Sequence, residues 1–337
     1  MLIVPLLLAS VIALAYAYTA AKARTIEKAF PKIGVLTDVG GYRINALHLA
    51  RPPGADLPPL VFIHGASGNL RDQMQAFAGP LSARAEMLFV DRPGHGYSER
   101  GGADNAFPSG QADAIAALME RLGIGPAIIV GHSFGGAIAA AFGVRHPQRT
   151  AGLLFLAPAT HPWPGGVDWY YTLAAMPVIG WLFAHTLVIP AGLRKLERGT
   201  VGVFSPNPRP DGYVEKTAPA LVLRPTVFRN NARDVVNLLG YVTREALRYR
   251  EITAPTVIIT GDRDDVVLAE LHSIGLERDI EGAELITIRN LGHKPDYIAN
   301  DVAIAAIEHL AGMPQDLQEM GRQAEMRIAA ELRQSEP

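Results

Sequence analysis

A serine between glycines is the clearest candidate for chemistry in this sequence. The hexapeptide GHSFGG spans residues 131–136 and places Ser133 in a Gly-X-Ser-X-Gly pattern. An apolar run, 127–130, precedes it and small residues, 137–144, follow it, which predicts a strand, a tight turn and a helix. Such a turn lifts a serine hydroxyl above the edge of a sheet. Because a hydroxyl is a poor nucleophile without a base, Ser133 alone does not distinguish a nucleophile from a polar turn residue.

A base and an acid are available later in the chain. His293 lies in NLGHKPD, and Asp264 lies in TGDRDDVV, each just past a predicted strand. Taken singly, a loop histidine is typically solvated, and a run of aspartates is typical of a helix N-cap. The order Ser133, Asp264, His293, each at the carboxyl end of a strand, is the order of nucleophile, acid and base in one strand–helix architecture. The three residues are therefore predicted to work together in nucleophilic catalysis.

The elements that must position these residues are short apolar runs that alternate with helical stretches. The predicted strands are 35–39, 43–49, 60–63, 87–90, 127–130, 153–156, 256–260 and 285–288. The predicted helices lie near 70–83, 108–122, 134–146, 264–280 and 300–311. This alternation predicts an α/β fold with a mostly parallel sheet flanked by helices. Two glycines at 40–41 predict a hairpin, so the sheet should open antiparallel.

One long interval interrupts this alternation. Residues 158–255 separate two strands that a simple crossover would join in far fewer residues, which predicts an inserted helical lid between core segments 33–157 and 256–313. The three tryptophans of the chain, Trp163, Trp169 and Trp181, all lie in it. Aromatic residues here either pack the lid's own core or face a substrate. Trp163 and Trp169 are predicted to bind substrate.

Both ends of the chain differ from this pattern. Residues 2–21 carry no charge and are long enough to cross a bilayer core of about 30 Å, so residues 1–24 are predicted to be an anchor or a signal segment. Three basic residues follow, at 22, 24 and 28, which favours a retained anchor with its C-terminal flank in the cytoplasm. The alternative is a cleaved signal, supported by AYA at 15–17, with a secreted or periplasmic product. The charged tail, 314–337, is predicted to be a solvated helix that frays.

Composition excludes several classes of function. The chain of 337 residues has a formal net charge of -2 and no broad basic surface, so nucleic acid is not an expected partner. It has no cysteine, which excludes disulfides and thiolate catalysis. None of its 10 histidines lies in an HExxH or a short-spaced pair, so neither a metal nor another cofactor is expected. The oligomeric state is left open by the sequence.

Five segments together resemble the α/β-hydrolase-fold serine hydrolases over about residues 33–313. They are HGASGN at 64–69, DRPGHGYSE at 91–99, GHSFGG at 131–136, GDRDDVV at 261–267 and GH at 292–293. In that family the acid lies three residues after the glycine that ends its strand, which implies Asp264 rather than Asp262 or Asp265. The resemblance further implies that Asp91 and His95 shape the loop beside the site.

The resemblance also implies an oxyanion hole and a mechanism. The backbone amides of Ala66 and Phe134 are the expected donors to the oxyanion, and the Ser67 hydroxyl is a further substrate-binding candidate. His293 would take the proton of Ser133 as its Oγ attacks a carbonyl carbon, and Asp264 would fix the imidazole tautomer.

The chemistry expected of such a site is acyl transfer to water. Relatives that open epoxides or displace halide use an aspartate nucleophile, so a serine leaves esters, with thioesters, lactones and lipid esters as variants. The apolar N-terminus and aromatic lid favour an apolar small-molecule substrate reached at a membrane. A cofactor-free haloperoxidase or perhydrolase with the same triad is the alternative, and a non-catalytic binding protein on the same fold is less favoured.

Overall fold

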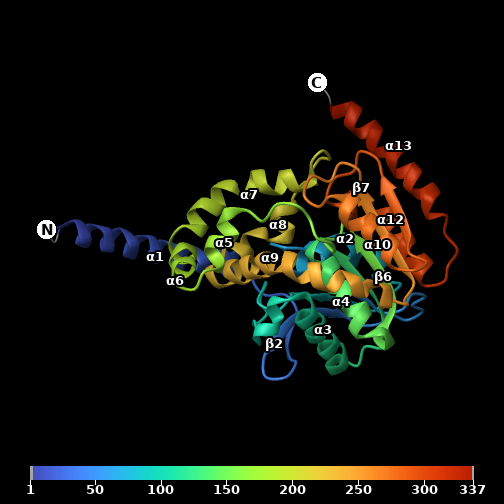
Figure 1. Ribbon diagram of the computed structural model, residues 1–337, viewed down its shortest axis with the longest axis horizontal. Coiled ribbons are helices and arrows are strands. Elements are labelled where there is room, and N and C mark those ends of the chain that lie inside the picture. Colours follow the sequence, from blue (N-terminus) through green and yellow to red (C-terminus); the bar gives the residue numbers. More distant parts are fainter. Residues whose placement is uncertain (1–2, 336–337) are drawn as a thin grey trace.

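The computed structural model describes residues 3–335 and contains one eight-stranded sheet with helices on both faces (Figure 1). The strands lie in the order β1-β2-β4-β3-β5-β6-β7-β8. Their bounds are β1 (Val35–Asp38), β2 (Arg43–Leu49), β3 (Leu60–Ile63), β4 (Met87–Val90), β5 (Ala127–His132), β6 (Thr150–Leu156), β7 (Thr256–Gly261) and β8 (Glu284–Ile288). β2 is antiparallel to both of its neighbours, and every later pair is parallel. The predicted antiparallel opening of a mostly parallel sheet is confirmed.

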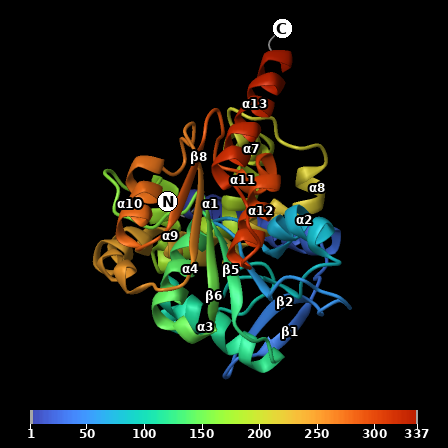
Figure 2. The same cartoon turned by 90° about the vertical axis from the view of Figure 1, so that its right-hand side faces the viewer.

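Two hydrophobic cores lie on the two faces of this sheet (Figure 2). Because side chains alternate along a strand, Val61 and Ile63 of β3 enter one core while Leu60 and Phe62 enter the other. The first core is covered by α3 (Pro108–Leu122), α4 (Phe134–Arg145) and α10 (Ala269–Asp279). The second is covered by α2 (Leu70–Leu81), α12 (Asn300–Leu310) and α13 (Leu317–Ser335).

The interval 158–255, called the lid below, is mainly helical and lies at one end of the molecule (Figure 1). Its helices are α5 (Trp169–Ala175), α6 (Val178–Thr186), α7 (Val188–Phe204), α8 (Tyr213–Thr217) and α9 (Pro225–Glu245), with short 3-10 turns at Pro219–Leu223 and Ala246–Glu251. α9 is the longest of them and runs back toward the sheet (Figure 1). It therefore links the far end of the lid to the loops beside the strand ends.

α1 (Ile3–Ala29) is the one helix of the described chain that is long and apolar enough to cross a membrane. Leu2, which the sequence includes in this segment, lies outside the described residues. The C-terminal part of α1 packs on the lid, where Thr19 Oγ1 donates a hydrogen bond to Thr186 O at 3.4 Å and Ile26 is buried. The N-terminal part projects away from the molecule (Figure 1).

Two predictions about the C-terminal third of the chain need correction. α10 begins at Ala269 rather than near 264, because the Asp264 side chain accepts hydrogen bonds from backbone amides of the preceding turn. The tail does form a helix, α13, but it is not fully solvated. Leu317, Ala324 and Ile328 are buried against the second core, since they recur at helical spacing on one face of an otherwise charged segment. The last two residues of the predicted tail, 336–337, lie outside the described residues.

Candidate active site

Ser133 occupies a strained turn between β5 and α4. Its backbone has φ 53° and ψ -118°, a conformation that costs a non-glycine residue on the order of 1–3 kcal/mol. The turn is held by hydrogen bonds from Ser133 N to Leu156 O at 3.0 Å and from Ala159 N to Ser133 O at 3.0 Å. A Cβ on Gly135 would lie 2.2 Å from Ile63 O. The glycine is therefore required by the close approach of α4 to β3.

Asp264 and His293 are hydrogen-bonded to each other at the ends of β7 and β8. Asp264 Oδ2 accepts from His293 Nδ1 at 2.7 Å, and both side chains are buried. The other carboxylate oxygen of Asp264 accepts from the amides of Val266 and Val267, each at 2.9 Å. With its proton on Nδ1, His293 has Nε2 unprotonated and able to accept a proton. The sequence thus places an acid and a histidine that the fold brings together across 29 residues.

The two other acids of this turn point elsewhere. Asp262 is exposed and its Oδ1 accepts from Asn290 N at 2.6 Å, and Asp265 is also exposed. Neither contacts His293 in the described part of the chain. Of the three acids, Asp264 is the one hydrogen-bonded to His293 in the described part of the chain, and its role as the catalytic acid stays a prediction.

His132 joins the Ser133 turn to the His293 loop, a contact that sequence reasoning missed. Its Nε2 donates to the backbone carbonyl of His293 at 2.9 Å, and the two rings lie 4.9 Å apart. Burial, together with the nearby charge of Lys294, holds the pKa of His132 well below its ordinary value. A neutral His132 therefore fixes the loop that carries His293. Its position beside Ser133 was the only signal available in the sequence.

The loop 64–69 lies against the Ser133 turn. A Cβ on Gly65 would be 3.1 Å from Ser133 Cβ. Gly65 O accepts hydrogen bonds from His64 Nδ1 at 2.8 Å and from Arg92 Nη2 at 3.2 Å. The C=O of Gly65 and the N–H of Ala66 belong to the same trans peptide unit and point in opposite directions. The hydrogen bonds to Gly65 O therefore also fix the direction of the Ala66 N–H. Within residues 3–335 neither the Ala66 nor the Phe134 amide has a hydrogen-bond acceptor.

The lid is hydrogen-bonded to this same loop through Ser67. Asn231 of α9 accepts from Ser67 N at 2.8 Å and donates to Ser67 Oγ at 3.1 Å. Ser67 Oγ also lies 3.4 Å from the hydroxyl of Tyr171 in α5. Ser67 has φ 59°, so its backbone is held in a sparsely populated conformation by these contacts. The predicted substrate-binding Ser67 therefore sits between the lid and the Ser133 turn.

Arg92 extends the connection between lid and core. Its guanidinium is fully buried and forms an ion pair with Asp234 of α9, with Nη1 3.2 Å from Oδ2. The guanidinium also lies 4.5 Å from the centre of the Phe134 ring. His95 Nε2 accepts from Arg92 Nη2 at 3.0 Å, and burial with the neighbouring arginine lowers the pKa of His95 well below its ordinary value. Asp91 accepts hydrogen bonds from the backbone amides of Leu70, the first residue of α2, and Tyr97, both at 2.8 Å. These contacts agree with the structural role implied for Asp91 and His95.

The two tryptophans predicted to bind substrate occupy different environments. Trp163 is half-buried against the first core, where its ring lies 5.8 Å from that of His272. Trp169 is 70% exposed and packs only on Tyr170 and Phe183 among the aromatic residues described. The position of Trp169 on the outer surface of the lid does not support the predicted substrate contact. Tyr171, two residues further along α5, is the side chain that reaches Ser67.

A buried charge cluster lies behind His293. Lys294 Nζ donates to Asp72 Oδ2 and to Asp296 Oδ2, each at 2.9 Å. Burial raises the pKa of Asp296 to about 6. Asp72, His132 and Asp296 place ligand-type atoms within 4.8 Å of one another, a spacing that could hold a metal ion. The ammonium of Lys294 is already bonded to both carboxylates, so these residues fit an internal lysine better than a metal.

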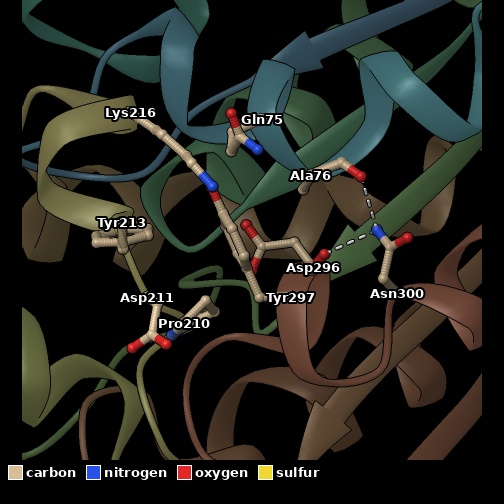
Figure 3. A pocket seen from close by; sticks show the side chains of 9 residues that line it. All are labelled: Gln75, Ala76, Pro210, Asp211, Tyr213, Lys216, Asp296, Tyr297 and Asn300. Atoms are coloured by element: carbon tan, nitrogen blue, oxygen red, sulfur yellow. Dashed lines mark hydrogen bonds between the residues drawn. The ribbon is translucent and has the colours of Figure 1, made fainter.

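A cavity of about 240 Å³ lies beside this cluster (Figure 3). It is lined by Gln75, Ala76, Pro210, Asp211, Tyr213, Lys216, Asp296, Tyr297 and Asn300. Ser133, Asp264 and His293 are not among the lining residues, and all three side chains are buried. The cavity is therefore separate from the residues predicted to carry chemistry.

Comparison with known proteins gives a consistent result. A family model described as "alpha/beta hydrolase fold" matches residues 58–178. The chain is 29% identical to 2-hydroxymuconate semialdehyde hydrolase of Pseudomonas putida, over 78% of this chain and 88% of that protein. It is 24% identical to monoacylglycerol lipase abhd6-B of Xenopus laevis, over 75% and 74% of the two chains. It shares a fold with a bacterial membrane phospholipase A at a TM-score of 0.60 and 19% identity, covering 99% of this chain and 98% of the other.

Proposed function

Because the chain belongs to the α/β-hydrolase-fold family, we propose that it is a serine hydrolase that cleaves a carboxylic ester of an apolar substrate through an acyl-enzyme intermediate. The observation that supports the proposal most is the 2.7 Å hydrogen bond between the buried side chains of Asp264 and His293. His132, the neighbour of Ser133 in the chain, is hydrogen-bonded to the His293 carbonyl at 2.9 Å. A buried histidine whose tautomer is fixed by a carboxylate is the usual base for a serine nucleophile.

The proposed reaction has two stages, acylation of Ser133 and hydrolysis of the acyl-enzyme. His293 Nε2 takes the hydroxyl proton as Ser133 Oγ attacks the ester carbonyl, and the carbonyl oxygen becomes an oxyanion. The unengaged amides of Ala66 and Phe134 are available to bind that oxyanion, and one such donor is typically worth about 3 to 4 kcal/mol. Collapse breaks the bond to the alcohol, which takes the proton from His293. Water then attacks the acyl-Ser133 ester with His293 again as base, and the acid is released.

An apolar acyl group is the preferred substrate for two reasons. α1 is an apolar helix packed on the lid, so a lipid phase would lie near the site if α1 inserts. Among the related proteins, a monoacylglycerol lipase and a membrane phospholipase A are named for lipid esters. Thioesters and lactones are variants of the same chemistry. The substrate is a small molecule in each case.

We also propose that α1 is kept as a membrane anchor with its basic C-terminal flank on the cytoplasmic side. Residues 22, 24 and 28 supply the positive charge that favours this orientation. The Tyr16 ring stacks on His185 of α6 at 5.8 Å, so the helix is packed on the lid from within its apolar part. Cleavage at the predicted AYA site would remove that contact.

The test combines active-site labelling with an ester series. The detergent-solubilised full chain should be labelled by a fluorophosphonate probe, and Ser133→Ala or His293→Ala should abolish labelling and lower kcat by about 10⁴-fold or more. Ser82→Ala, a change at an exposed serine on another loop, is the matched control and should leave both unchanged. Equal labelling of Ser133→Ala would refute the nucleophile.

Chain length and peroxide then separate the substrate classes. Turnover of p-nitrophenyl butyrate and octanoate should exceed that of the acetate. A steady fall in kcat/KM beyond acetate would remove the apolar substrate, and activity that requires peroxide and a carboxylic acid would favour the perhydrolase.

A further inference from the structure

A group of large apolar side chains is exposed at the end of the lid farthest from the sheet. They belong to α5 and α6 and are called the lid tip below: Trp169, Val178, Ile179, Trp181 and Leu182. Val178 is 78% and Ile179 60% exposed. Single exposed apolar residues are ordinary on a protein surface, whereas a contiguous group marks a surface that is covered by something else. α6 contains no lysine, arginine, aspartate or glutamate to solvate this face.

The lid tip is continuous with α1. The ring of Tyr16 lies 6.0 Å from that of Trp181, and Thr19 Oγ1 donates to the last carbonyl of α6, Thr186 O, at 3.4 Å. Figure 1 shows α1 leaving the body of the molecule beside α5 and α6. The lid tip and the apolar helix therefore form one exposed apolar surface rather than two.

The length of α1 places the lid tip relative to a membrane. Its uncharged part, residues 3–21, is about 28 Å long at 1.5 Å per residue, close to the ~30 Å hydrocarbon core of a bilayer. Only residues 3–11 are exposed throughout, and they cover about 14 Å. The remaining half of the apolar length lies alongside α6. Insertion of the whole apolar segment would therefore carry the lid tip into the membrane with it.

We propose that the lid tip is immersed in the phospholipid bilayer that holds α1, with its side chains at the boundary between acyl chains and headgroups. This proposal rests on the membrane anchoring of α1 proposed above and assigns the lid a second contact with the same bilayer. Tyrosine and tryptophan, both present where α1 meets α6, are typical of that boundary. The first basic residue, Lys22, follows directly where the apolar surface ends, within reach of lipid phosphates.

The bilayer contact would lie close to the site. Trp169 of the lid tip and Tyr171 belong to the same short helix, and the Tyr171 hydroxyl lies 3.4 Å from Ser67 Oγ. α5 therefore connects the membrane-facing surface with the loop beside Ser133.

The three tryptophans of the lid provide the test. Full-length variants that each keep one tryptophan, with the others changed to phenylalanine, are reconstituted into phosphatidylcholine vesicles whose acyl chains are brominated or plain. Bromine quenches only fluorophores within the membrane. We expect bromolipid to lower the emission of the Trp169 and Trp181 variants by about half, because interfacial aromatic rings reach the acyl chains. The half-buried Trp163 is the internal control and should change by less than about a tenth.

Three outcomes would overturn the proposal. If the vesicles float with bound protein but Trp169 and Trp181 are not quenched, α1 alone is inserted. If those two are unquenched and the chain crosslinks to a second copy through Cys introduced by Val178→Cys, the lid tip is a dimer surface. A chain that does not bind vesicles refutes the anchor and the proposal together.

A second pair of variants separates this proposal from the proposed reaction. Ser133→Ala in each single-tryptophan background should quench as its parent does, because the hydroxyl lies outside the lid tip. Val178→Glu with Ile179→Glu should weaken quenching of Trp181 at least twofold, while hydrolysis of a water-soluble acetate ester in detergent is unchanged. Ester hydrolysis retained by Ser133→Ala, with quenching intact, would count against the reaction alone. Quenching unaffected by the glutamates would count against the lid tip alone.

Discussion

Asp264→Asn should nearly abolish catalysis by forcing the wrong tautomer on His293. The Asp264 Oδ1 position faces the amides of Val266 and Val267, each 2.9 Å away. An asparagine is expected to place its oxygen there, since the reverse orientation leaves the buried amide of Val267 and the part-buried amide of Val266 unsatisfied, at a cost of about 1–3 kcal/mol for the buried one. Its NH₂ group then faces His293 Nδ1 and donates to it. The imidazole proton moves to Nε2, which can no longer accept the proton of Ser133.

The expected effect on catalysis is large because two backbone amides, those of Val266 and Val267, hold the asparagine oxygen in this orientation. A bias of about 1–3 kcal/mol or more toward this orientation leaves the productive tautomer a minor species, from about a sixth of the population downward. The same change in a serine protease triad lowers kcat by about 10⁴-fold. At 1.36 kcal/mol per tenfold, that is about 5 kcal/mol of lost transition-state stabilisation. The change should leave the overall fold intact, since the asparagine oxygen keeps the two backbone hydrogen bonds.

The assay measures the rate of single-turnover acylation by p-nitrophenyl butyrate. The rate of labelling by the fluorophosphonate probe is a second measurement of the same step. Asp262→Asn is the matched control, because Asp262 is an exposed carboxylate of the same turn whose Oδ1 accepts a hydrogen bond from Asn290 N. Its kcat should stay within about twofold of the parent, as expected for an exposed charge. Retention of more than a tenth of the parent rate by Asp264→Asn would refute the tautomer argument. Loss of activity in the Asp262 variant alone would move the acid to that residue.

Three further predictions concern the support of the site. Gly135→Ala should destabilise the chain by about 3 kcal/mol or more in urea unfolding, because its Cβ would meet a backbone carbonyl 2.2 Å away, whereas Gly79→Ala, with open space around it, should stabilise slightly. Asn231→Ala removes both bonds to Ser67 and should slow acylation about tenfold with less effect on KM, measured by stopped flow. Burial raises the folded pKa of Asp296 to about 6, above its unfolded value of 3.8, so the folded state binds more protons between these values and stability falls as pH rises through them. Asp296→Asn should remove that fall, so between pH 4 and 7 the free energy of unfolding of the variant should rise by about 1–3 kcal/mol relative to that of the parent, measured in urea. Parallel pH dependences of the two free energies would contradict this prediction.

The strands, and the positions of Asp264 and His293 just past two of them, were predictable from local patterns. β2, β3 and β4 have the predicted bounds, because each is a short apolar or alternating run between polar or proline-rich stretches. Asp264 and His293 follow predicted strands, and parallel strands end at one edge of the sheet, so their meeting follows from the topology. Which face of a helix is buried was not predictable in the same way. The buried face of α13 rests on three apolar residues in a charged segment, a pattern that a charge-based reading overlooks.

The contacts that hold the site together are mostly long-range and polar. Asn231 and Ser67 are 164 residues apart, and nothing in either local sequence links them. Likewise, Trp169 is aromatic and lies in the lid, as a substrate-binding residue would, yet its side chain faces outward while Tyr171 faces inward. The direction of a side chain on a short helix depends on its neighbours in space. Pattern and composition therefore predict which segment lies beside the site, but not which residue of that segment contacts it.

The bonds from α9 to the core have a consequence for anyone exchanging lids between related hydrolases to change substrate preference. Residues 158–255 form one insertion in the chain, but α9 supplies Asn231 to Ser67 and Asp234 to the buried Arg92. A donor segment that ends before α9 would keep the support of the Ala66 amide and replace only the outer helices. A transplant of the whole interval would deliver a new lid surface but would remove the bonds from Asn231 that hold loop 64–69. The useful junction for such chimaeras lies within the insertion, in the loop before Pro225, and not at its ends.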